Sequence, residues 1–387
     1  MVAVATSWRV WRGGVTLNDH VVALFVVANI GVYPVIYTLA AWAGHPWTAL
    51  AALLWVGPLA IYGLFHALDQ RTDPGAFWFA AGRAAQPAMA FALWAGLFLV
   101  LGGTVFAAGW LLGGWPVPAP SPWPLALLVG PGVLAAWGTA WTYQQHLAVR
   151  TNRVRVGEAG RVIRVIHLSD IHASPLMVRS DIREMVERAT ALRPDLVVAT
   201  GDFLMPFSEE EHAYLVEELA RFPVPVLGCL GNHDLPVATR LVEEFRAAGM
   251  RILVDEVTTL SIDGTVVEVA GVQFHWRNAR ENFAAALAAL PTGTAPVRIL
   301  LAHDPRLFGW LPVGRFQLVL SGHTHGGQVG TDMFGLHWSV LRPFGVFDQG
   351  RFDRPQGSLW VHRGNWHTGL PPRMGIAAEI VVHEIQA

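Results

Sequence analysis

Short polar segments in the C-terminal part of the chain carry side chains that bind hard and borderline metal ions. Each segment directly follows an apolar run that is typical of a buried strand. Carboxylates, an amide and imidazoles suit Mn, Fe or Zn better than a soft thiolate site, and the only cysteine, Cys229, lies within an apolar run. In chain order the candidate segments are Asp170-Ile171-His172, Gly201-Asp202, Gly231-Asn232-His233-Asp234, His303 and Gly322-His323-Thr324-His325.

Strand and helix patterns alternate after residue 160, and this alternation predicts an α/β domain with an at least partly parallel sheet. Sites in open α/β sheets form beyond the carboxyl ends of the strands, which is where the polar segments fall. We expect β-structure at 161–168, 195–200, 224–230, 251–274 (with a turn at Asp263-Gly264), 297–302, 316–320, 358–362 and 377–384. The expected helices cover 179–192, 208–221, 236–248 and 279–289.

The local motifs differ in how strongly they point to a site. In Asp170-x-His172, strand alternation would point both side chains to the same side. Gly231 permits a tight bend that aims Asn232 and His233 together. Any one motif could be an ordinary turn or a satisfied core histidine, but chance does not explain all of them in this order.

This order of motifs resembles the calcineurin-like metallophosphoesterase superfamily over about residues 161–385. The resemblance implies a four-layer α/β fold, a β-sandwich flanked by helices, with two divalent metal ions (Mn, Fe or Zn) at its edge. It also implies that His233 contacts the substrate phosphate or protonates the leaving oxygen, and that Asp234 orients His233. The implied metal ligands are Asp170, His172 and His325 for one ion, Asn232, His303 and His323 for the other, and Asp202 as the bridge between them.

The physical chemistry of two metal ions agrees with these implied roles. Two ions about 3.5–4 Å apart acidify a bridging water and clamp the phosphoryl oxygens during in-line displacement. A carboxylate suits the bridging position of Asp202 because it offers two oxygens and a negative charge. The neutral carbonyl of Asn232 limits the total ligand charge, which leaves the centre electrophilic.

The segment 361–373 resembles a less general element of membrane-linked bacterial members of the superfamily, an Arg-Gly turn followed by Pro and Arg. Arg363 and Arg373 are therefore candidate contacts for the substrate phosphate, although each could equally pair with a surface carboxylate. Trp276 and Arg277 lie in a segment that departs from the pattern of relatives. They could line a substrate groove or belong to a plain loop.

The N-terminal part of the chain has a different composition. The whole chain is 53% hydrophobic and 14% charged, and residues 21–68 and 84–149 contain no Asp, Glu, Lys or Arg. Each stretch is long enough for two helices of about 20 residues that cross a bilayer. We expect transmembrane helices near 20–43, 47–68, 86–112 and 123–143, a transmembrane domain over 1–150 and a metallophosphoesterase domain over 156–387.

Arginine placement predicts the orientation of this anchor. The chain has no lysine. The arginines of the N-terminal part lie before the first expected span, between the second and third, and after the fourth, which marks these segments as cytoplasmic. With four spans, both ends and the catalytic domain would lie in the cytoplasm, at the inner or plasma membrane. Residues 156–387 carry 20 Arg against 26 Asp and Glu, a net charge of −6, which argues against a nucleic-acid partner.

The sequence therefore favours a membrane-anchored two-metal phosphohydrolase that cleaves a phosphoester or pyrophosphate bond. Its expected partners are the lipid bilayer and a phosphorylated lipid or small-molecule substrate. One alternative is a phosphodiesterase or phosphatase that acts on a soluble substrate. Another is a membrane sensor or transporter with a metal-binding domain, which the lack of charged residues inside the expected spans disfavours.

Overall fold

The structure is a computed structural model that describes residues 112–113, 133–142, 144–157, 161–174, 177, 179–205, 209–332, 337–366 and 373–387. The chain divides into two compact units, Met1–Trp141 with Gly369–Pro372, and Thr142–Thr368 with Arg373–Ala387. The expected spans lie outside the described residues, except for helical residues at 112–113 and 133–142. Within the described ranges, no helix is both long enough and apolar enough to cross a membrane.

The first sheet of the second unit contains six strands in the order β1-β14-β2-β3-β4-β5. Neighbouring strands are parallel except for β14 and β2, which are antiparallel. The strands are β1 (Ala148–Arg155), β14 (Glu379–Gln386), β2 (Val162–Leu168), β3 (Leu196–Ala199), β4 (Val226–Gly228) and β5 (Arg251–Ile252). The sheet therefore places the last strand of the chain between the first two.

The second sheet also contains six strands, in the order β12-β13-β9-β8-β7-β6, with antiparallel pairs at its two edges and parallel pairs between. The expected turn joins β6 and β7, and both its residues, Asp263 and Gly264, have positive φ, as a two-residue hairpin requires. The strands are β12 (Gly350–Arg354), β13 (Gly357–Val361), β9 (Leu318–Ser321), β8 (Val297–Ala302), β7 (Thr265–Val272) and β6 (Glu256–Ile262).

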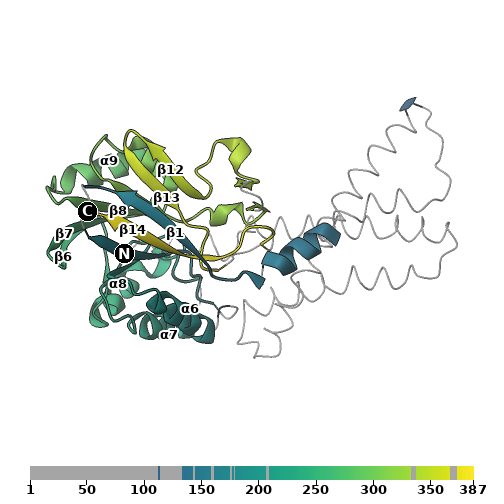
Figure 1. The fold of residues 1–387 in the computed structure, drawn as a ribbon, viewed down its shortest axis with the longest axis horizontal. Helices are drawn as coiled ribbons and strands as arrows, with labels where there is room; N and C mark the ends of the chain where they lie inside the picture. Colours follow the sequence, from purple (N-terminus) through teal and green to yellow (C-terminus); the bar gives the residue numbers. More distant parts are fainter. Residues whose placement is uncertain are drawn as a thin grey trace, which may run out of the picture. The chain divides into compact units, whose positions relative to one another are not determined.

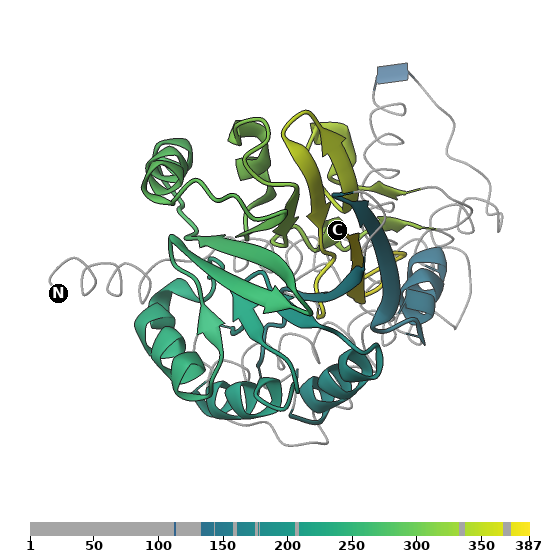
Figure 2. The ribbon, with the colours of Figure 1, turned by 60° about the vertical axis from the view of Figure 1, so that its left-hand side comes forward.

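The two sheets pack face to face, and helices cover their outer faces (Figures 1 and 2). Apolar residues of both sheets, among them Val165, Val198, Ile299 and Leu320, form one buried cluster between them. Helices α6 (Arg179–Ala191), α7 (Glu209–Leu219) and α8 (Ala238–Ala247) pack on the first sheet. Helix α9 (Ala279–Ala289) and the 3-10 helix η2 (Pro305–Trp310) pack on the second. The domain is thus a mixed α/β fold of four layers.

Strands of both sheets end at the polar segments that the sequence singles out. Asp170, Asp202 and Asn232 follow β2, β3 and β4, whereas His303 and His323 follow β8 and β9. The expectation that the polar segments fall just after strand ends is confirmed.

Strand β1 was not expected from the sequence. Its residues alternate between exposed and half-buried or buried positions, and it lies at the boundary expected between the transmembrane domain and the metallophosphoesterase domain. Only pairing with β14, more than 220 residues later in the chain, makes it a strand. The short strands β10 (Gly330–Thr331) and β11 (Trp338–Ser339) were not expected either.

Candidate metal centre

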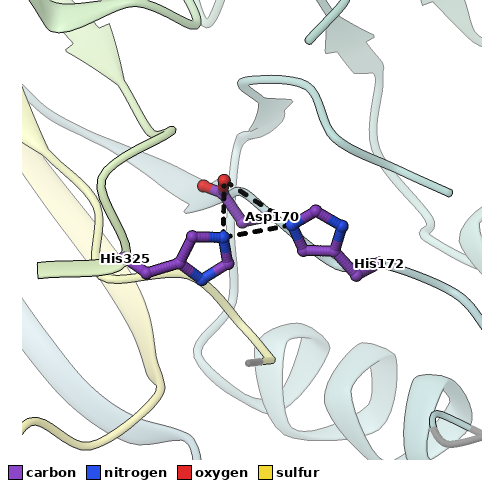
Figure 3. A group of neighbouring side chains, drawn as sticks. All are labelled: Asp170, His172 and His325. Carbon is purple, nitrogen blue, oxygen red and sulfur yellow. Dashed lines mark hydrogen bonds and ion pairs between the residues drawn. The ribbon is translucent and has the colours of Figure 1, made fainter. Parts of the chain in front are cut away.

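Three buried side chains converge at the first group of possible ligand atoms (Figure 3). The Nε2 atoms of His172 and His325 lie 3.1 Å apart. Oδ1 of Asp170 lies 3.3 Å from His325 Nε2 and 4.0 Å from His172 Nε2. These three side chains could hold a metal ion, since their ligand atoms lie within 4.8 Å of one another.

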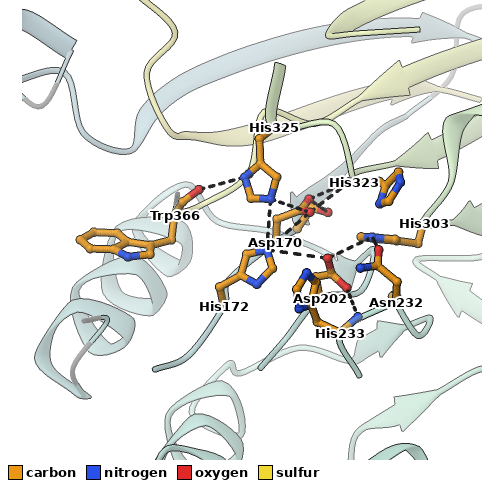
Figure 4. A network of polar contacts seen from close by, with 12 residues as sticks. Asp170, His172, Asp202, Asn232, His233, His303, His323, His325 and Trp366 are labelled. Atoms are coloured by element: carbon orange, nitrogen blue, oxygen red, sulfur yellow. Dashed lines mark hydrogen bonds and ion pairs between the residues drawn. The ribbon is translucent and has the colours of Figure 1, made fainter. Parts of the chain in front are cut away.

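A second group lies on the other side of Asp202 (Figure 4). Asp202, His303 and His323 also bring their ligand atoms within 4.8 Å of one another. Nε2 of His303 lies 3.2 Å from Asp202 Oδ2 and 3.1 Å from Asn232 Oδ1. The structure thus brings together the four residues that the sequence assigned to the second ion and to the bridge.

Asp202 faces both groups through a single oxygen. Its Oδ2 lies 3.7 Å from His172 Nε2 in the first group and 3.2 Å from His303 Nε2 in the second. Its Oδ1 accepts a hydrogen bond of 2.8 Å from the backbone N–H of His233. This hydrogen bond fixes the carboxylate so that Oδ2 points between the two groups.

The backbone of the candidate ligands adopts a rare conformation. Strand alternation was expected to aim Asp170 and His172, but both residues have left-handed φ angles, 52° and 48°. Asp202, His323 and His325 also have positive φ, at 52°, 72° and 51°. Non-glycine residues rarely adopt this region, and such residues cluster at functional sites where the surrounding structure holds them. The turns after the strands, rather than the strands themselves, aim these side chains.

Glycines allow the loops of the centre to touch. Gly201 has a φ of 83°, and a Cβ atom there would overlap the backbone N of Gly231. A Cβ atom on Gly231 would overlap Oδ1 of Asp202. The Gly-Asp and Gly-Asn-His-Asp motifs therefore need glycine because their two loops pack backbone against backbone.

Asp234 is fully buried and holds the loop that carries Asp202. Its Oδ2 accepts hydrogen bonds from the backbone N–H groups of Asp202 and Gly231, each at 2.8 Å. Its Oδ1 accepts from Phe203 at 2.8 Å and from Leu204 at 3.3 Å. The resemblance implied that Asp234 orients His233, whereas these contacts orient the backbone around Asp202.

Burial and mutual charge shift the pKa values of the centre strongly. Burial raises the pKa of Asp170 to about 7, and the charge of Asp202 adds to the increase. Burial would also raise the pKa of Asp202, but His303, His172 and His233 hold it well below its ordinary value. Burial opposes a charge on His303, yet Asp202 raises its pKa to about 10. Without a metal ion, Asp170 and Asp202 are thus both close to His303, and its single positive charge cannot neutralise both carboxylates.

The donor set fits divalent metal ions. Burial, His172 and Arg373 lower the pKa of His325 well below its ordinary value, so its imidazole is neutral at neutral pH. Nδ1 of His325 lies 3.3 Å from the carbonyl oxygen of Trp366, and Nδ1 of His303 lies 2.6 Å from that of Thr200. A carbonyl only accepts, so Nδ1 of His303 donates and its Nε2 is the atom left for a metal. Nδ1 of His325 also lies 3.4 Å from Nη2 of Arg373, which only donates. Imidazole Nε2 atoms and carboxylate oxygens therefore face one another, and a metal ion would take the place of the proton that Asp202 holds on His303.

The centre is accessible from one side. Asn232, His233 and His323 are partly exposed, whereas the ligand candidates behind them are buried. The ring of Phe274 lies 5.4 Å from that of His323, and the ring of Trp276 lies 4.9 Å from Phe274. Trp276 is 66% exposed. Phe274 and Trp276 therefore form an aromatic wall next to His323, on the accessible side of the centre.

The two arginines considered as substrate contacts are buried and have protein partners. Arg363 pairs with Asp332 at 2.9 Å and with Glu379 at 3.5 Å. Arg373 donates to the backbone carbonyls of Arg363 and Trp366. These contacts hold the segment beside His325 in place, and contact with a substrate remains a prediction for both arginines.

Sequence reasoning missed the polar residues that support Asp170. The Ser169 hydroxyl donates to Asp170 Oδ2 at 2.6 Å, and Asn365 accepts from the Ser169 backbone N–H at 2.8 Å. Thr200 donates to Ser169 at 2.7 Å. Ser169 directly precedes Asp170 and Thr200 directly precedes Gly201-Asp202. Their position at the end of apolar strands was the available signal.

Comparison with known proteins agrees with this geometry. The family described as calcineurin-like phosphoesterase matches residues 163–327. An uncharacterized metallophosphoesterase of Aquifex aeolicus (strain VF5) is 31% identical over 247 residues, which cover 62% of this chain and 91% of that protein. The uncharacterized metallophosphoesterase YkuE of Bacillus subtilis (strain 168) is 27% identical, covering 58% of this chain and 79% of YkuE.

A third relative is the phosphodiesterase YaeI of Escherichia coli (strain K12). It is 28% identical over 179 residues, which cover 44% of this chain and 64% of YaeI, so the match spans slightly less than two thirds of that protein. The fold and the site define a metallophosphoesterase domain. The chain belongs to the calcineurin-like phosphoesterases and is a metal-dependent hydrolase of that family.

Proposed function

We propose that this chain cleaves a phosphoester or pyrophosphate bond at a centre of two divalent metal ions. Asp170, His172 and His325 would hold one ion, and Asn232, His303 and His323 the other. Asp202 would bridge the two. The observation that carries this proposal is Oδ2 of Asp202, which lies between His172 Nε2 at 3.7 Å and His303 Nε2 at 3.2 Å.

When bound, the two metals would supply an activated water and neutralise the charge of the phosphoryl oxygens. The protein's own residues would hold the ligand atoms in place before substrate arrives. Asp234 fixes the Asp202 loop through four backbone hydrogen bonds, and the carbonyls of Thr200 and Trp366 hold the rings of His303 and His325. Such preorganisation lowers the cost of reaching the transition state.

His233 would act on the substrate rather than on a metal. It lies on the accessible side of the centre, with its ring edge-on to His172 at 4.9 Å. Burial lowers its pKa, so the free imidazole is neutral at neutral pH. An anionic phosphate nearby would raise this pKa, so that the ring becomes protonated. The protonated ring could then donate its proton to the leaving oxygen.

The proposed substrate has an apolar or aromatic part next to its phosphate. The support is the wall of Phe274 and Trp276 beside His303 and His323. A lipid-linked phosphate or pyrophosphate fits this wall and also fits a membrane anchor. Mn, Fe and Zn all suit the ligand set.

We further propose that the expected transmembrane helices anchor the metallophosphoesterase domain, which includes β1, to the cytoplasmic face of the membrane. The apolar composition of the N-terminal part and its arginine pattern support this placement. The helical residues 133–142 add support. Val133, Leu134, Trp137 and Trp141 are exposed at helical spacing, so one face of this segment is apolar.

The substrate proposal is tested with the full chain purified in detergent and supplied with Mn²⁺. The ratio kcat/KM is compared for a lipid-linked phosphate ester and its water-soluble head-group analogue. We expect the lipid-linked ester to be preferred, and Trp276→Ala to lower that preference by about tenfold through lost apolar contact. Trp310→Ala, which removes an exposed tryptophan from η2, is the matched control. Equal ratios for both substrates would favour a soluble substrate instead.

The proposed placement is tested with reporters fused after Ala387 and within the two expected loops that carry no arginine. A reporter that is active only in the cytoplasm should work at the C-terminus and fail in those loops. The reverse pattern would contradict the cytoplasmic placement of the domain.

A further inference from the structure

A row of buried polar side chains crosses the first sheet behind the metal centre. Asn152 of β1, His383 of β14 and His167 of β2 lie on neighbouring strands, and all three are buried. Asn152 and His383 are direct partners in the β1–β14 register. At one end of the row is Arg351 of β12, and at the other are Thr200, Ser169 and Asp170.

Six successive contacts connect these side chains into one chain of hydrogen bonds. Nη1 of Arg351 lies 3.3 Å from Asn152 Oδ1, and Asn152 Nδ2 lies 2.9 Å from His383 Nδ1. His383 Nε2 lies 3.3 Å from His167 Nδ1, and His167 Nε2 lies 2.8 Å from Thr200 Oγ1. Thr200 then donates to Ser169 at 2.7 Å, and Ser169 donates to Asp170 Oδ2 at 2.6 Å.

The two ends of this chain fix the direction of every hydrogen bond. A guanidinium can only donate, so the atom of Asn152 that faces Arg351 is its oxygen, and its amide nitrogen donates to His383. At the other end, Thr200 donates to Ser169 and Ser169 donates to Asp170, which accepts as the ionised carboxylate that a metal ligand must be. The Thr200 oxygen must then accept from His167 Nε2–H. His167 Nδ1 is left bare and accepts from His383 Nε2–H.

The direction requires both histidines to be neutral and to carry their proton on Nε2. A proton on either Nδ1 would set two donors against each other. Burial lowers the pKa of His383 to about 3 and the pKa of His167 well below its ordinary value. Both rings are therefore neutral over the ordinary range of pH, as the chain of hydrogen bonds needs.

We propose that this hydrogen-bond chain, from Arg351 to Ser169, positions Asp170 as a metal ligand. Ser169 occupies Asp170 Oδ2, which leaves Oδ1 facing His172 and His325. Successive hydrogen bonds of one direction polarise and strengthen one another, so the last one holds the carboxylate more firmly than Ser169 alone would. His167, His383 and Asn152 act through Ser169 and Thr200 and are positioning residues. This role rests on the proposed metal function of Asp170.

The direction of the chain is tested first, in the metal-free full-length protein labelled with ¹⁵N-histidine. Imidazole ¹⁵N shifts report which nitrogen carries the proton, and the nuclear Overhauser contact between the two rings identifies them. We expect Nε2–H with a bare Nδ1 on both His167 and His383 near neutral pH. A proton on Nδ1 of either ring would overturn the inference, whatever the outcome of the metal experiments.

The positioning role is tested by metal affinity. Thr200→Val removes the hydroxyl and keeps the shape, and we expect it to weaken binding of the first Mn²⁺ by about 10-fold to 100-fold, the usual effect of a lost outer partner. Ser321→Ala is the matched control. Ser321 is also buried, lies two residues before a candidate ligand as Thr200 does, and its hydroxyl has no hydrogen-bond partner among the described residues. Affinity in this variant should stay unchanged.

The coupling along the chain separates positioning from simple packing. His167→Phe should weaken Mn²⁺ binding in the wild-type background but have little further effect in Thr200→Val, because the chain is already broken there. Full and independent losses from the two substitutions, or normal affinity in Thr200→Val, would overturn the positioning role. A wild-type protein that binds no metal would instead contradict the proposed function, and the ¹⁵N result would still decide the direction of the chain.

Discussion

Two clusters of charged side chains in the same domain differ in whether their carboxylates are paired with arginine. Around Glu218 of α7, the guanidinium groups of Arg179, Arg183 and Arg221 approach the carboxylate to 2.7, 2.7 and 3.1 Å. At the metal centre, no arginine of the described residues forms an ion pair with Asp170 or Asp202. Imidazole nitrogens face these carboxylates instead.

The difference shows which cluster serves stability and which serves function. The Glu218 cluster contains its own counter-charges, and it joins α6 to α7 without any ligand. The metal centre gathers groups that repel or desolvate one another, and it holds them with left-handed backbone and buried hydrogen bonds. Such an arrangement is typical of a site where a bound cation neutralises the buried carboxylates. Four measurements would break or sharpen this contrast.

The largest effect is expected for Asp202→Ala. Its oxygen faces both groups of ligand atoms, so its loss should weaken both metals by more than about 100-fold, beyond the effect of an outer partner. Hydrolysis should fall to background. Elemental analysis and turnover of the purified variant check this result. Normal turnover with both metals still bound would show that Asp202 does not bridge.

His233→Ala is expected to lower kcat by about 10²–10⁴-fold while both metals stay bound. The side chain lies on the accessible side of the centre, and the hydrogen bond from His233 to Asp202 comes from its backbone N–H. Steady-state kinetics at saturating Mn²⁺, paired with elemental analysis, measure the two properties separately. Loss of a metal would make His233 a ligand, as its place in a group with His172 and Asp202 permits.

Adding Mn²⁺ to the metal-free protein should stabilise the fold. Binding to the folded state alone adds about 2.7 kcal/mol at a free metal concentration about 100 times Kd. Thermal unfolding with and without Mn²⁺ measures the increment. Glu218→Gln should show the same increment as wild type, because its cluster takes no metal. An unchanged Tm for the wild type would remove the basis of the contrast.

The smallest effect is expected for Glu218→Gln. The hydrogen bond from Arg183, with that from Arg179, lowers the pKa of Glu218 from 4.5 to about 2. A carboxyl whose pKa is lower in the folded state stabilises the protein above its unfolded pKa, and this contribution disappears as the pH falls from 4.5 toward about 2. Because solvent screens the half-exposed arginines, the loss should be about 1 kcal/mol at neutral pH.

Chemical denaturation of Glu218→Gln at several pH values checks this estimate. The difference from wild type should shrink as the pH falls through that window. Glu217→Gln is the matched control, since Glu217 is exposed and, among the described residues, forms an ion pair with Arg179 alone. It should change stability by less than about 0.5 kcal/mol. An equal loss in both variants would mean that the cluster is not centred on Glu218.

Local patterns predicted much of the fold. Helix α9 and strand β8 have the expected bounds because α9 is rich in alanine, a strong helix former, and β8 is a nearly continuous apolar run. The position of Asp170, Asp202 and His303 after strand ends also followed from the apolar runs before them. The membrane spans expected near 20–43, 47–68, 86–112 and 123–143 stay predictions, because only residues 112 and 133–142 of them are described.

The parts that sequence reasoning missed depend on distant partners. Strand β1 has a weak pattern of its own and is defined by β14. His167 and His383 lie inside apolar strands and belong to none of the motifs, and only the fold brings their ring nitrogens to 3.3 Å. The left-handed φ of Asp170 and His172 is set by the loops packed around them, so the alternation rule for strands did not apply.

The place of β14 between β1 and β2 has a consequence for the way this domain is made. A ribosome releases the strands in chain order, and β14 is the last of them. Until it emerges, β1 has no neighbour and β2 has an unpaired edge, so the sheet that carries Asp170 stays open. The nascent domain therefore completes this sheet only once β14 has been made, and a chain interrupted before Glu379 would leave β2 with an unpaired edge.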